Sequence, residues 1–263
     1  MLRYCPLFSG SSGNSTYVGT AEGGVLIDVG VSAKRIESAL RCRDIEPGQI
    51  RAVLITHEHT DHVAGLSVLC RRYRFPVLAS AGTLDALAEA GRVTPDQPLY
   101  ALSPGRSVNV YGLRVTPFSA PHDSRECLGF RLDGGGRALT VATDMGFVPA
   151  ELPALAAGCQ LIHVESNHDP VMLKNGPYPP FLQQRIAGDG GHLANAACAA
   201  VLPQLLSGGT TRFVLAHLSQ KNNDPALARQ VSADALTACG AQVGRDVLLA
   251  VAPPENDGGV IVF

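Results

Sequence analysis

Short apolar runs separated by turn residues predict β-structure in the first third of the chain. Residues 15–18 and 25–29 are two such runs, and Glu22-Gly23-Gly24 between them is a hairpin signal. Residues 33–40 are expected to form a helix. Residues 52–56 form a continuous β-branched and apolar run that leads directly into His57. Such a run is typical of a strand buried on both faces.

The middle of the chain continues this alternation of helices and strands. We expect a helix from residue 61 or 62 to residue 72, which Pro76 prevents from continuing. The other expected elements are a strand at 77–80, a helix at 81–90 and strands at 108–111, 113–118, 128–132 and 138–143. Further on we expect helices at 149–157, 178–187, 192–202 and 225–239, with strands at 159–165, 212–216, 247–251 and 260–263. Interleaved helices and strands predict an α/β protein with two packed sheets flanked by helices.

Composition places the chain among globular proteins. Of its 263 residues 46% are apolar and 17% charged, which excludes disorder. The balance of 21 basic against 23 acidic residues gives no overall attraction to nucleic acid or to an anionic membrane. Seven cysteines lie singly without a CxxC pair, which argues against a disulfide framework or a thiolate zinc site. With no signal peptide or membrane span in the sequence, we expect a cytoplasmic protein.

The strongest chemical signal is the string His57-Glu58-His59-Thr60-Asp61-His62 after the buried strand. Three imidazoles and a carboxylate within one loop and one helical turn are what two adjacent divalent ions need. The alternative is a polar strand-to-helix turn in which Asp61 only caps the helix. Clustered imidazoles at the end of a buried strand are costly without partners, so we favour metal binding.

Two coordination spheres need more ligands than this string supplies. Candidate residues follow three other predicted strands. His122 and Asp123 follow the first, Asp144 follows the second, and His217 follows the third. Each is a weak signal alone, whereas their order after the HxHxDH string is specific.

With these residues in place, the sequence resembles the metallo-β-lactamase superfamily over nearly its whole length. The resemblance implies a four-layer αββα sandwich. It also implies that His57, His59 and His122 bind a first metal ion, that Asp61, His62 and His217 bind a second, and that Asp144 bridges both. Zinc or manganese suits imidazole and carboxylate ligands, and iron is possible.

Within the superfamily, the chain looks like the YycJ/WalJ-type branch of exonucleases and phosphodiesterases. The matching stretches are Phe8 to Ser15, Glu165 to Asp169, Met172-Leu173, Tyr178-Pro179, Gly191 to Asn195, and His217 to Ser219 with Asn222-Asn223. Two residues depart from the branch: Ala194 stands where relatives usually have Ser, and Cys127 where they often have Pro. Any hydroxyl function at position 194 is therefore missing here.

Spacing separates this branch from the β-CASP nucleases, which carry an added domain after the bridging Asp. Asp144 and His217 are only 73 positions apart, which leaves no room for a domain of about 100 residues. We therefore expect one metallo-β-lactamase-like domain over residues 1–263, in which loops must supply any contact with nucleic acid.

The leading hypothesis is a metal-dependent phosphodiester hydrolase, a DNA exonuclease that uses a metal-bridged hydroxide. Asp61 is suited to orient that hydroxide, and His192 or His168 could protonate the leaving group. The runner-up is a thioester or lactone hydrolase of the glyoxalase type, which would share the metal ligands but not the stretches around His168 and His192. A non-catalytic scaffold is a third reading, disfavoured because all seven ligand positions are filled.

Several polar residues are candidates for substrate contacts, although simple turn or capping roles compete with that reading. The candidates are Ser9, Ser11, Asn14, Asn167, Lys174, Arg185 and Asn222. His163, which alternates with apolar residues in a predicted strand, is interpreted as structural. Arg71, Arg72 and Arg74 form a basic cluster at a predicted helix end, where they complement the helix dipole.

Overall fold

The computed structural model describes all residues from 1 to 263 and divides into two compact units, each built from separate stretches of the chain. Unit 1 contains Met1–Ser119, Ser124–Arg137 and Pro253–Phe263. Unit 2 contains Ala120–Asp123 and Ala138–Ala252. No helix combines the length and apolar character that crossing a bilayer requires.

Unit 1 is built on a mixed sheet of seven strands, in the order β14-β1-β2-β3-β4-β5-β6. The strands are β1 (Arg3–Phe8), β2 (Ser15–Thr20), β3 (Gly23–Ile27), β4 (Ile50–Leu54), β5 (Val77–Ser80), β6 (Leu99–Leu102) and β14 (Ile261–Val262). The β2–β3 hairpin is antiparallel, and β3 to β6 pair in parallel. A parallel arrangement buries both faces of β4, as its apolar run predicts.

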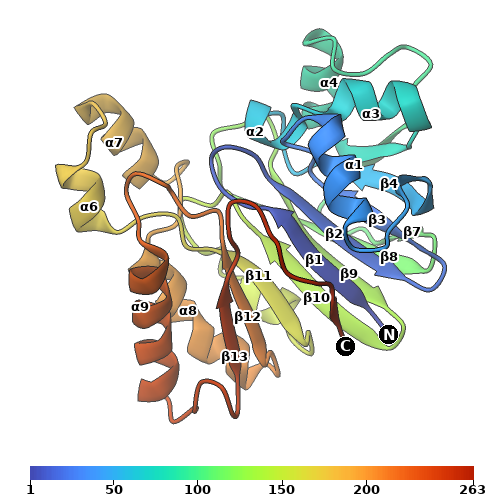
Figure 1. The fold of residues 1–263 in the computed structure, drawn as a ribbon. Helices are drawn as coiled ribbons and strands as arrows, with labels where there is room; N and C mark the ends of the chain where they lie inside the picture. Colours follow the sequence, from blue (N-terminus) through green and yellow to red (C-terminus); the bar gives the residue numbers. More distant parts are fainter. The chain divides into compact units, whose positions relative to one another are not determined.

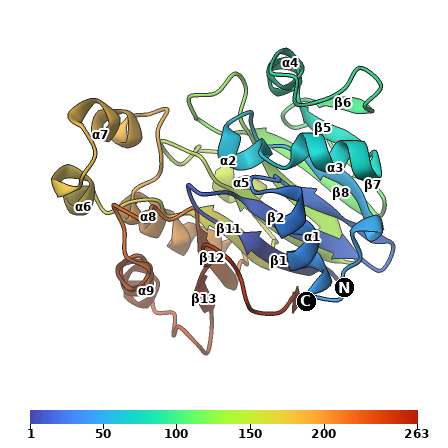
Figure 2. The ribbon, with the colours of Figure 1, turned by 45° about the horizontal axis from the view of Figure 1, so that its top comes forward.

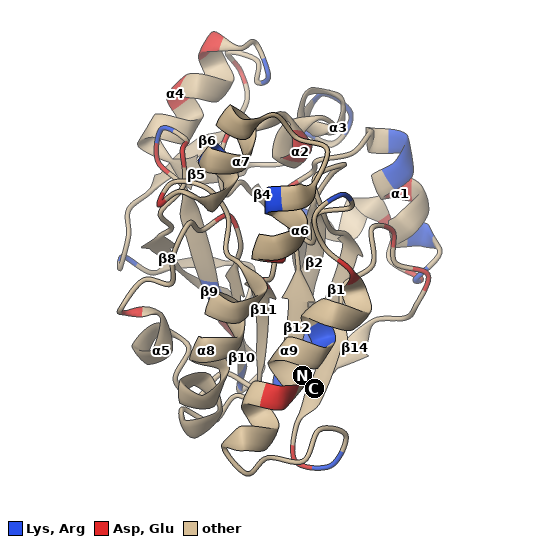
Figure 3. Ribbon diagram, turned by 90° about the vertical axis from the view of Figure 1, so that its left-hand side faces the viewer, with Lys and Arg blue, Asp and Glu red and all other residues tan.

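The helices of unit 1 lie between these strands in the chain. They are α1 (Ala33–Arg41), the 3₁₀ turn η1 (Pro47–Gln49), α2 (Thr60–Val63), α3 (Leu66–Tyr73) and α4 (Ala81–Glu89). Figures 1 and 2 show α1 and α3 side by side. An antiparallel meander completes the unit, with β7 (Val108–Val110), β8 (Leu113–Ser119) and β9 (Leu128–Gly134). Figure 3 shows basic residues on α1 and acidic residues on α4, so this unit carries charges of both signs.

Unit 2 is built on four parallel strands. These are β10 (Arg137–Ala142), β11 (Leu161–Glu165), β12 (Arg212–Ala216) and β13 (Leu248–Val251), paired in sequence order. The helices are α5 (Leu152–Leu155), α6 (Pro170–Asn175), α7 (Pro180–Ala187), α8 (Asn195–Ser207) and α9 (Pro225–Ala238). Helices α8 and α9 pack against each other (Figure 1). The carboxyl ends of β10, β11 and β12 all reach one edge of this sheet, where a parallel sheet places its functional residues.

The single helix predicted from residue 61 or 62 to residue 72 is wrong, because α2 ends at Val63 and α3 begins at Leu66, with Gly65 between them. The Gly65 N–H donates to the Val29 carbonyl (2.8 Å) instead of to the carbonyl four residues earlier. That carbonyl, on Asp61, accepts from the Asn14 N–H (2.8 Å). A Cβ at position 65 would lie 2.4 Å from the Val31 carbonyl oxygen, so only glycine fits there.

Other predicted boundaries also shift. The helix predicted at 192–202 starts at Asn195 and runs through Pro203 to Ser207. The helix predicted at 178–187 starts at Pro180 and is preceded by the short α6, which was not predicted. Six residues are too few to show a helical period. Strand β6 was also missed because three of its four residues are exposed, which leaves no alternating pattern.

Candidate metal-binding clusters

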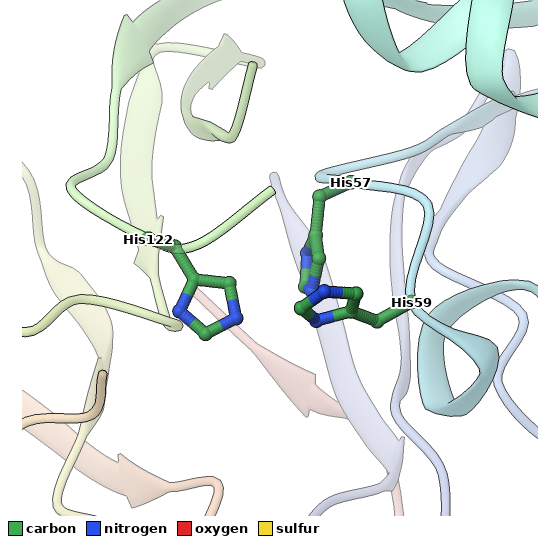
Figure 4. A group of neighbouring side chains, drawn as sticks. All are labelled: His57, His59 and His122. Carbon is green, nitrogen blue, oxygen red and sulfur yellow. The ribbon is translucent and has the colours of Figure 1, made fainter. Parts of the chain in front are cut away.

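The HxHxDH string lies where β4 ends. The last strand residue is Leu54, and the chain then passes through His57 and His59 into α2, which carries Asp61 and His62. Figure 4 shows His57 and His59 on this segment. The His57 ring centroid lies 4.5 Å from that of His59 and 4.2 Å from that of His62. We define the unit 1 cluster as six residues: His57, His59, Asp61 and His62 of the string, together with Asp28 and Thr56.

The Asp28 carboxylate links two residues of the unit 1 cluster by hydrogen bonds. Its carboxylate accepts hydrogen bonds from the Thr56 N–H (2.9 Å), the Thr56 hydroxyl (2.9 Å) and His62 Nδ1 (2.8 Å). Burial raises the pKa of Asp28, and the charge and hydrogen bonds of His62 and Thr56 oppose that rise. Since His62 Nδ1 donates to this carboxylate, Nε2 is the His62 nitrogen that can bind a metal ion.

His57 is fixed in the same way. Its Nδ1 lies 3.0 Å from the Thr56 hydroxyl, whose own proton goes to Asp28. His57 Nδ1 must therefore donate, and Nε2 carries the lone pair. On the neighbouring ring, Asn14 Nδ2 lies 3.1 Å from His62 Nε2. A metal ion bound to His62 Nε2 would use the lone pair of that nitrogen, which could then no longer accept a hydrogen bond from the Asn14 amide.

Gly30 lets three segments of unit 1 approach one another. A Cβ there would lie 1.7 Å from the Asp61 carbonyl oxygen and 2.6 Å from the Asn14 amide nitrogen. The Gly30 N–H donates to the Asn14 carbonyl (2.8 Å), and the Val29 N–H to the His62 carbonyl (2.8 Å). These contacts hold the backbone of α2 against residues 28–30.

A second cluster lies in unit 2, at the carboxyl ends of its strands. Asp144 follows β10, Glu165 ends β11, His217 follows β12 and His192 precedes α8. These four residues offer ligand atoms that all lie within 4.8 Å of one another. With His122, which follows β8 in the chain (Figure 4), they form the unit 2 cluster.

Glu165 holds two of these histidines. One carboxylate oxygen, Oε1, accepts from His192 Nδ1 (2.8 Å) and His217 Nδ1 (3.0 Å). The other, Oε2, accepts from the backbone N–H groups of Met145 (2.8 Å) and Leu193 (3.2 Å). Burial raises the pKa of Glu165, but the charges and hydrogen bonds of the two histidines outweigh it and hold that pKa below its ordinary value.

His122 follows the same pattern as the other ligand candidates. Its Nδ1 lies 2.9 Å from the Gly191 carbonyl oxygen, so Nδ1 donates and Nε2 carries the lone pair. Nε2 lies 3.8 Å from Asp144 Oδ1. Burial lowers the pKa of His122, which favours the neutral ring that a metal ion requires.

The chemistry of both clusters fits divalent metal ions. In His57, His62, His122 and His217, Nδ1 is engaged by an oxygen of the protein, which orients the ring and leaves Nε2 as the ligand atom. Buried carboxylates supply negative charge, and no cysteine belongs to either cluster. Imidazole and carboxylate donors of this kind suit zinc, manganese or iron.

The predicted substrate-contact residues occupy varied positions. The Asn167 side chain is buried and donates to the His217 carbonyl (2.8 Å), which ties the segment after β11 to the one after β12. Asn222 and Ser9 are also buried, whereas Ser11 and Lys174 are exposed. Asn14 accepts from the Gly10 N–H through its side chain (2.9 Å).

Arg185 is already neutralised within unit 2. Its guanidinium contacts both carboxylate oxygens of Asp123, at 2.5 and 2.9 Å. A bidentate pair of this kind is geometrically specific. The residue next to the candidate ligand His122 is thereby tied to the end of α7.

The remaining histidines differ in environment. His168 is 3% exposed, and burial lowers its pKa, which disfavours its imidazolium form. His192 retains some exposure and has the Glu165 carboxylate as its partner. His163 is buried within β11, where burial lowers its pKa to about 3, in agreement with the structural role predicted for it.

Sequence reasoning missed the residues that orient the ligands: Asp28, Thr56 and Glu165. Glu165 begins a motif of the YycJ/WalJ branch, and Thr56 immediately precedes the string, but neither position by itself indicates a hydrogen-bond partner. Asp28 is separated from His62 by 34 positions and meets it only in the folded unit.

Comparisons with known proteins agree with this chemistry. Residues 24–218 match the family model of the β-lactamase superfamily domain. The chain is 36% identical to exodeoxyribonuclease YycJ of Bacillus anthracis, over 92% of each chain. It is 32% identical to exodeoxyribonuclease WalJ of Streptococcus pneumoniae, over 97% of this chain and 95% of that protein. A solved structure, the metallo-β-lactamase fold protein YhfI from Bacillus subtilis, aligns with a TM-score of 0.74 at 13% identity, over 99% and 98% of the two chains. That likeness shows the fold, two mixed β-sheets flanked by helices, which the sequence predicts.

Proposed function

The chain belongs to the β-lactamase superfamily and, within it, to the family of the exodeoxyribonucleases YycJ and WalJ, and we propose that it is a metal-dependent exodeoxyribonuclease. The observation that carries the proposal is the identity of 36% over 92% of both chains to a protein named for this activity. The oriented imidazoles and buried carboxylates of both clusters support it, because they have the donor chemistry that a metal-dependent hydrolase needs.

The proposal includes two divalent ions, with zinc, manganese or iron as candidates. His57, His59 and His122 would hold the first ion, and Asp61, His62 and His217 the second, with Asp144 shared. This assignment rests on the family resemblance and on the donor chemistry of each cluster. When bound, such ions activate water at neutral pH and neutralise the charge that develops on a phosphoryl group.

The chain's own residues orient the ligands and supply the proton. Asp28 and Glu165 fix the rings of His62 and His217 through their Nδ1 atoms. Of the two candidates for the leaving-group proton we favour His192, which is hydrogen-bonded to Glu165 and partly exposed. The low pKa of buried His168 makes it the poorer donor.

DNA as substrate, a single domain and a cytoplasmic location complete the proposal. Seven singly placed cysteines without a CxxC pair suit a reducing compartment. Ser9, Ser11, Asn14, Asn167, Lys174, Arg185 and Asn222 remain our candidates for substrate contacts.

The experiment incubates the metal-loaded protein with end-labelled single- and double-stranded DNA and RNA, beside a glutathione thioester. We expect release of mononucleotides from DNA, and loss of that release in an Asp61→Ala, His62→Ala variant. Glu255→Gln, which removes only an exposed ion pair with Arg35, is the matched control. Hydrolysis of the thioester with intact DNA would instead support the glyoxalase-type alternative. An undiminished rate in the Asp61, His62 variant would contradict the metal mechanism.

A further inference from the structure

The α6–α7 segment of unit 2, residues 170–188, presents apolar side chains to solvent. Phe181 on α7 is 73% exposed and Val171 on α6 is 66% exposed. Figures 1 and 2 show the two short helices as neighbours. We call residues 170–188 the hairpin. Exposed large apolar residues cost solvation free energy, and the presence of two on one 19-residue segment favours a binding surface there.

The charge of the hairpin narrows the class of partner. Its 19 residues contain two basic side chains, Lys174 and Arg185, and no acidic one. Arg185 is engaged by Asp123, whereas Lys174 is exposed and has no ion pair. Asn175, Gln183 and Gln184 add uncharged hydrogen-bonding groups. An exposed aromatic ring on the same short segment as an uncompensated cation and amides suits a polyanion that carries flat rings.

The hairpin is fastened at both ends to the segments that hold the unit 2 cluster. At its start, Asp169 caps α6 through the Val171 and Met172 N–H groups, and its own N–H donates to the Asn222 carbonyl (2.9 Å). At its end, the Ile186 carbonyl accepts from the His192 N–H (2.9 Å). Phe181 therefore has a defined position relative to the candidate proton donor.

From these observations we infer that the hairpin binds the unpaired bases of single-stranded DNA, with Phe181 as the residue on which a base stacks and Lys174 contacting a phosphate. The inference rests on the proposed function and adds a binding site that recognises bases without reading their sequence. Stacking suits an exonuclease, because every base has a π-face and the enzyme must accept all of them.

The test measures binding of fluorescently labelled dT20 and of an abasic strand of equal length, both phosphorothioate-linked to resist hydrolysis, to the metal-loaded full-length protein. Phe181→Ala should weaken binding of dT20 about tenfold and leave binding of the abasic strand unchanged. Lys174→Ala should weaken binding of both strands and reduce the salt slope by about 0.7. Tyr100→Ala, which removes a 56% exposed aromatic ring from β6, is the matched control and should change neither.

A spectroscopic readout does not depend on the alanine variant. The chain has no tryptophan, so Phe181→Trp introduces a single fluorophore at the stacking position. Its emission should be quenched by dT20 and not by the abasic strand. Unquenched emission with dT20 would overturn the inference. So would a Phe181→Ala variant that binds both strands equally more weakly, because that result would point to a phosphate contact or a protein surface. Failure of the metal-loaded wild type to release nucleotides from DNA would contradict the proposed function separately.

Discussion

Three residues of the two clusters have left-handed backbones that side chains rarely adopt. The φ angles are 60° at Asp28, 59° at Asp144 and 55° at His217. Each residue follows a strand, and the left-handed turn redirects the chain there. Such conformations cost free energy and persist where the surrounding structure enforces them, which is common at functional sites. Asp and His adopt this conformation more often than most other non-glycine residues, but an Asp or His at a strand end does not by itself predict it.

At Glu165 we predict that replacement by Gln weakens metal binding. The amide keeps the size of the side chain but can no longer accept from both His192 and His217 with a full negative charge. Loss of such an orienting partner typically lowers metal affinity about 10- to 100-fold. Calorimetric titration with Mn²⁺ measures the change, with Glu255→Gln as the exposed control. Equal affinities in the two variants would show that Glu165 does not orient the ligands.

At Gly30 we predict that a single methyl group disrupts the unit 1 cluster. A Cβ 1.7 Å from the Asp61 carbonyl oxygen forces the α2 backbone away from residues 28–30. Gly30→Ala should lower the midpoint of urea unfolding and reduce metal affinity together. Gly48→Ala is the matched control, because a Cβ there meets nothing within 4 Å. Similar effects of the two substitutions would mean that the close approach is not required.

At the scale of elements, the apolar pattern predicted the strands that carry the clusters better than the helices between them. The strand before His57, the strand before Asp144 and the strand before His217 were all located within two residues. Long buried runs have few alternatives, because only a central strand buries them on both faces. Helix limits failed where tertiary hydrogen bonds decided them, as at Gly65.

The start of α8 provides an element-scale prediction. Ala194 is its N-cap residue, with φ −68° and ψ 152°, and makes no side-chain capping bond. Serine at this position would accept a hydrogen bond from an N–H group of the first turn. Ala194→Ser should therefore raise the free energy of unfolding by about 1 kcal/mol in urea titrations. The same substitution at exposed Ala200, inside α8, should lower it slightly. Stabilisation at both positions would indicate an effect unrelated to capping.

For the whole molecule we predict that metal ions stabilise the fold. The imidazoles of each cluster come together only in the folded chain, so an ion at about 100 times its dissociation constant should add about 2.7 kcal/mol. For a chain of this length the melting temperature should rise by about 5 to 10 °C relative to protein in EDTA. Calorimetric scans of wild type and His57→Ala test this, and Gly48→Ala should keep the full rise. A rise that persists in His57→Ala would place the stabilising ion elsewhere.

The sequence by itself determined the family, the types of the candidate ligands and, within two residues, the ends of the strands that carry them, because ligand types, their order and the buried β-runs are local properties of the chain. Only the tertiary structure decided how those ligands are oriented. Asp28 meets His62 across 34 positions, and Glu165 meets His217 across 52. These pairs depend on the register of parallel strands and on left-handed turns, which no local pattern encodes. The exposed face of Phe181 was likewise settled only by folding, since exposure is a property of the packed molecule.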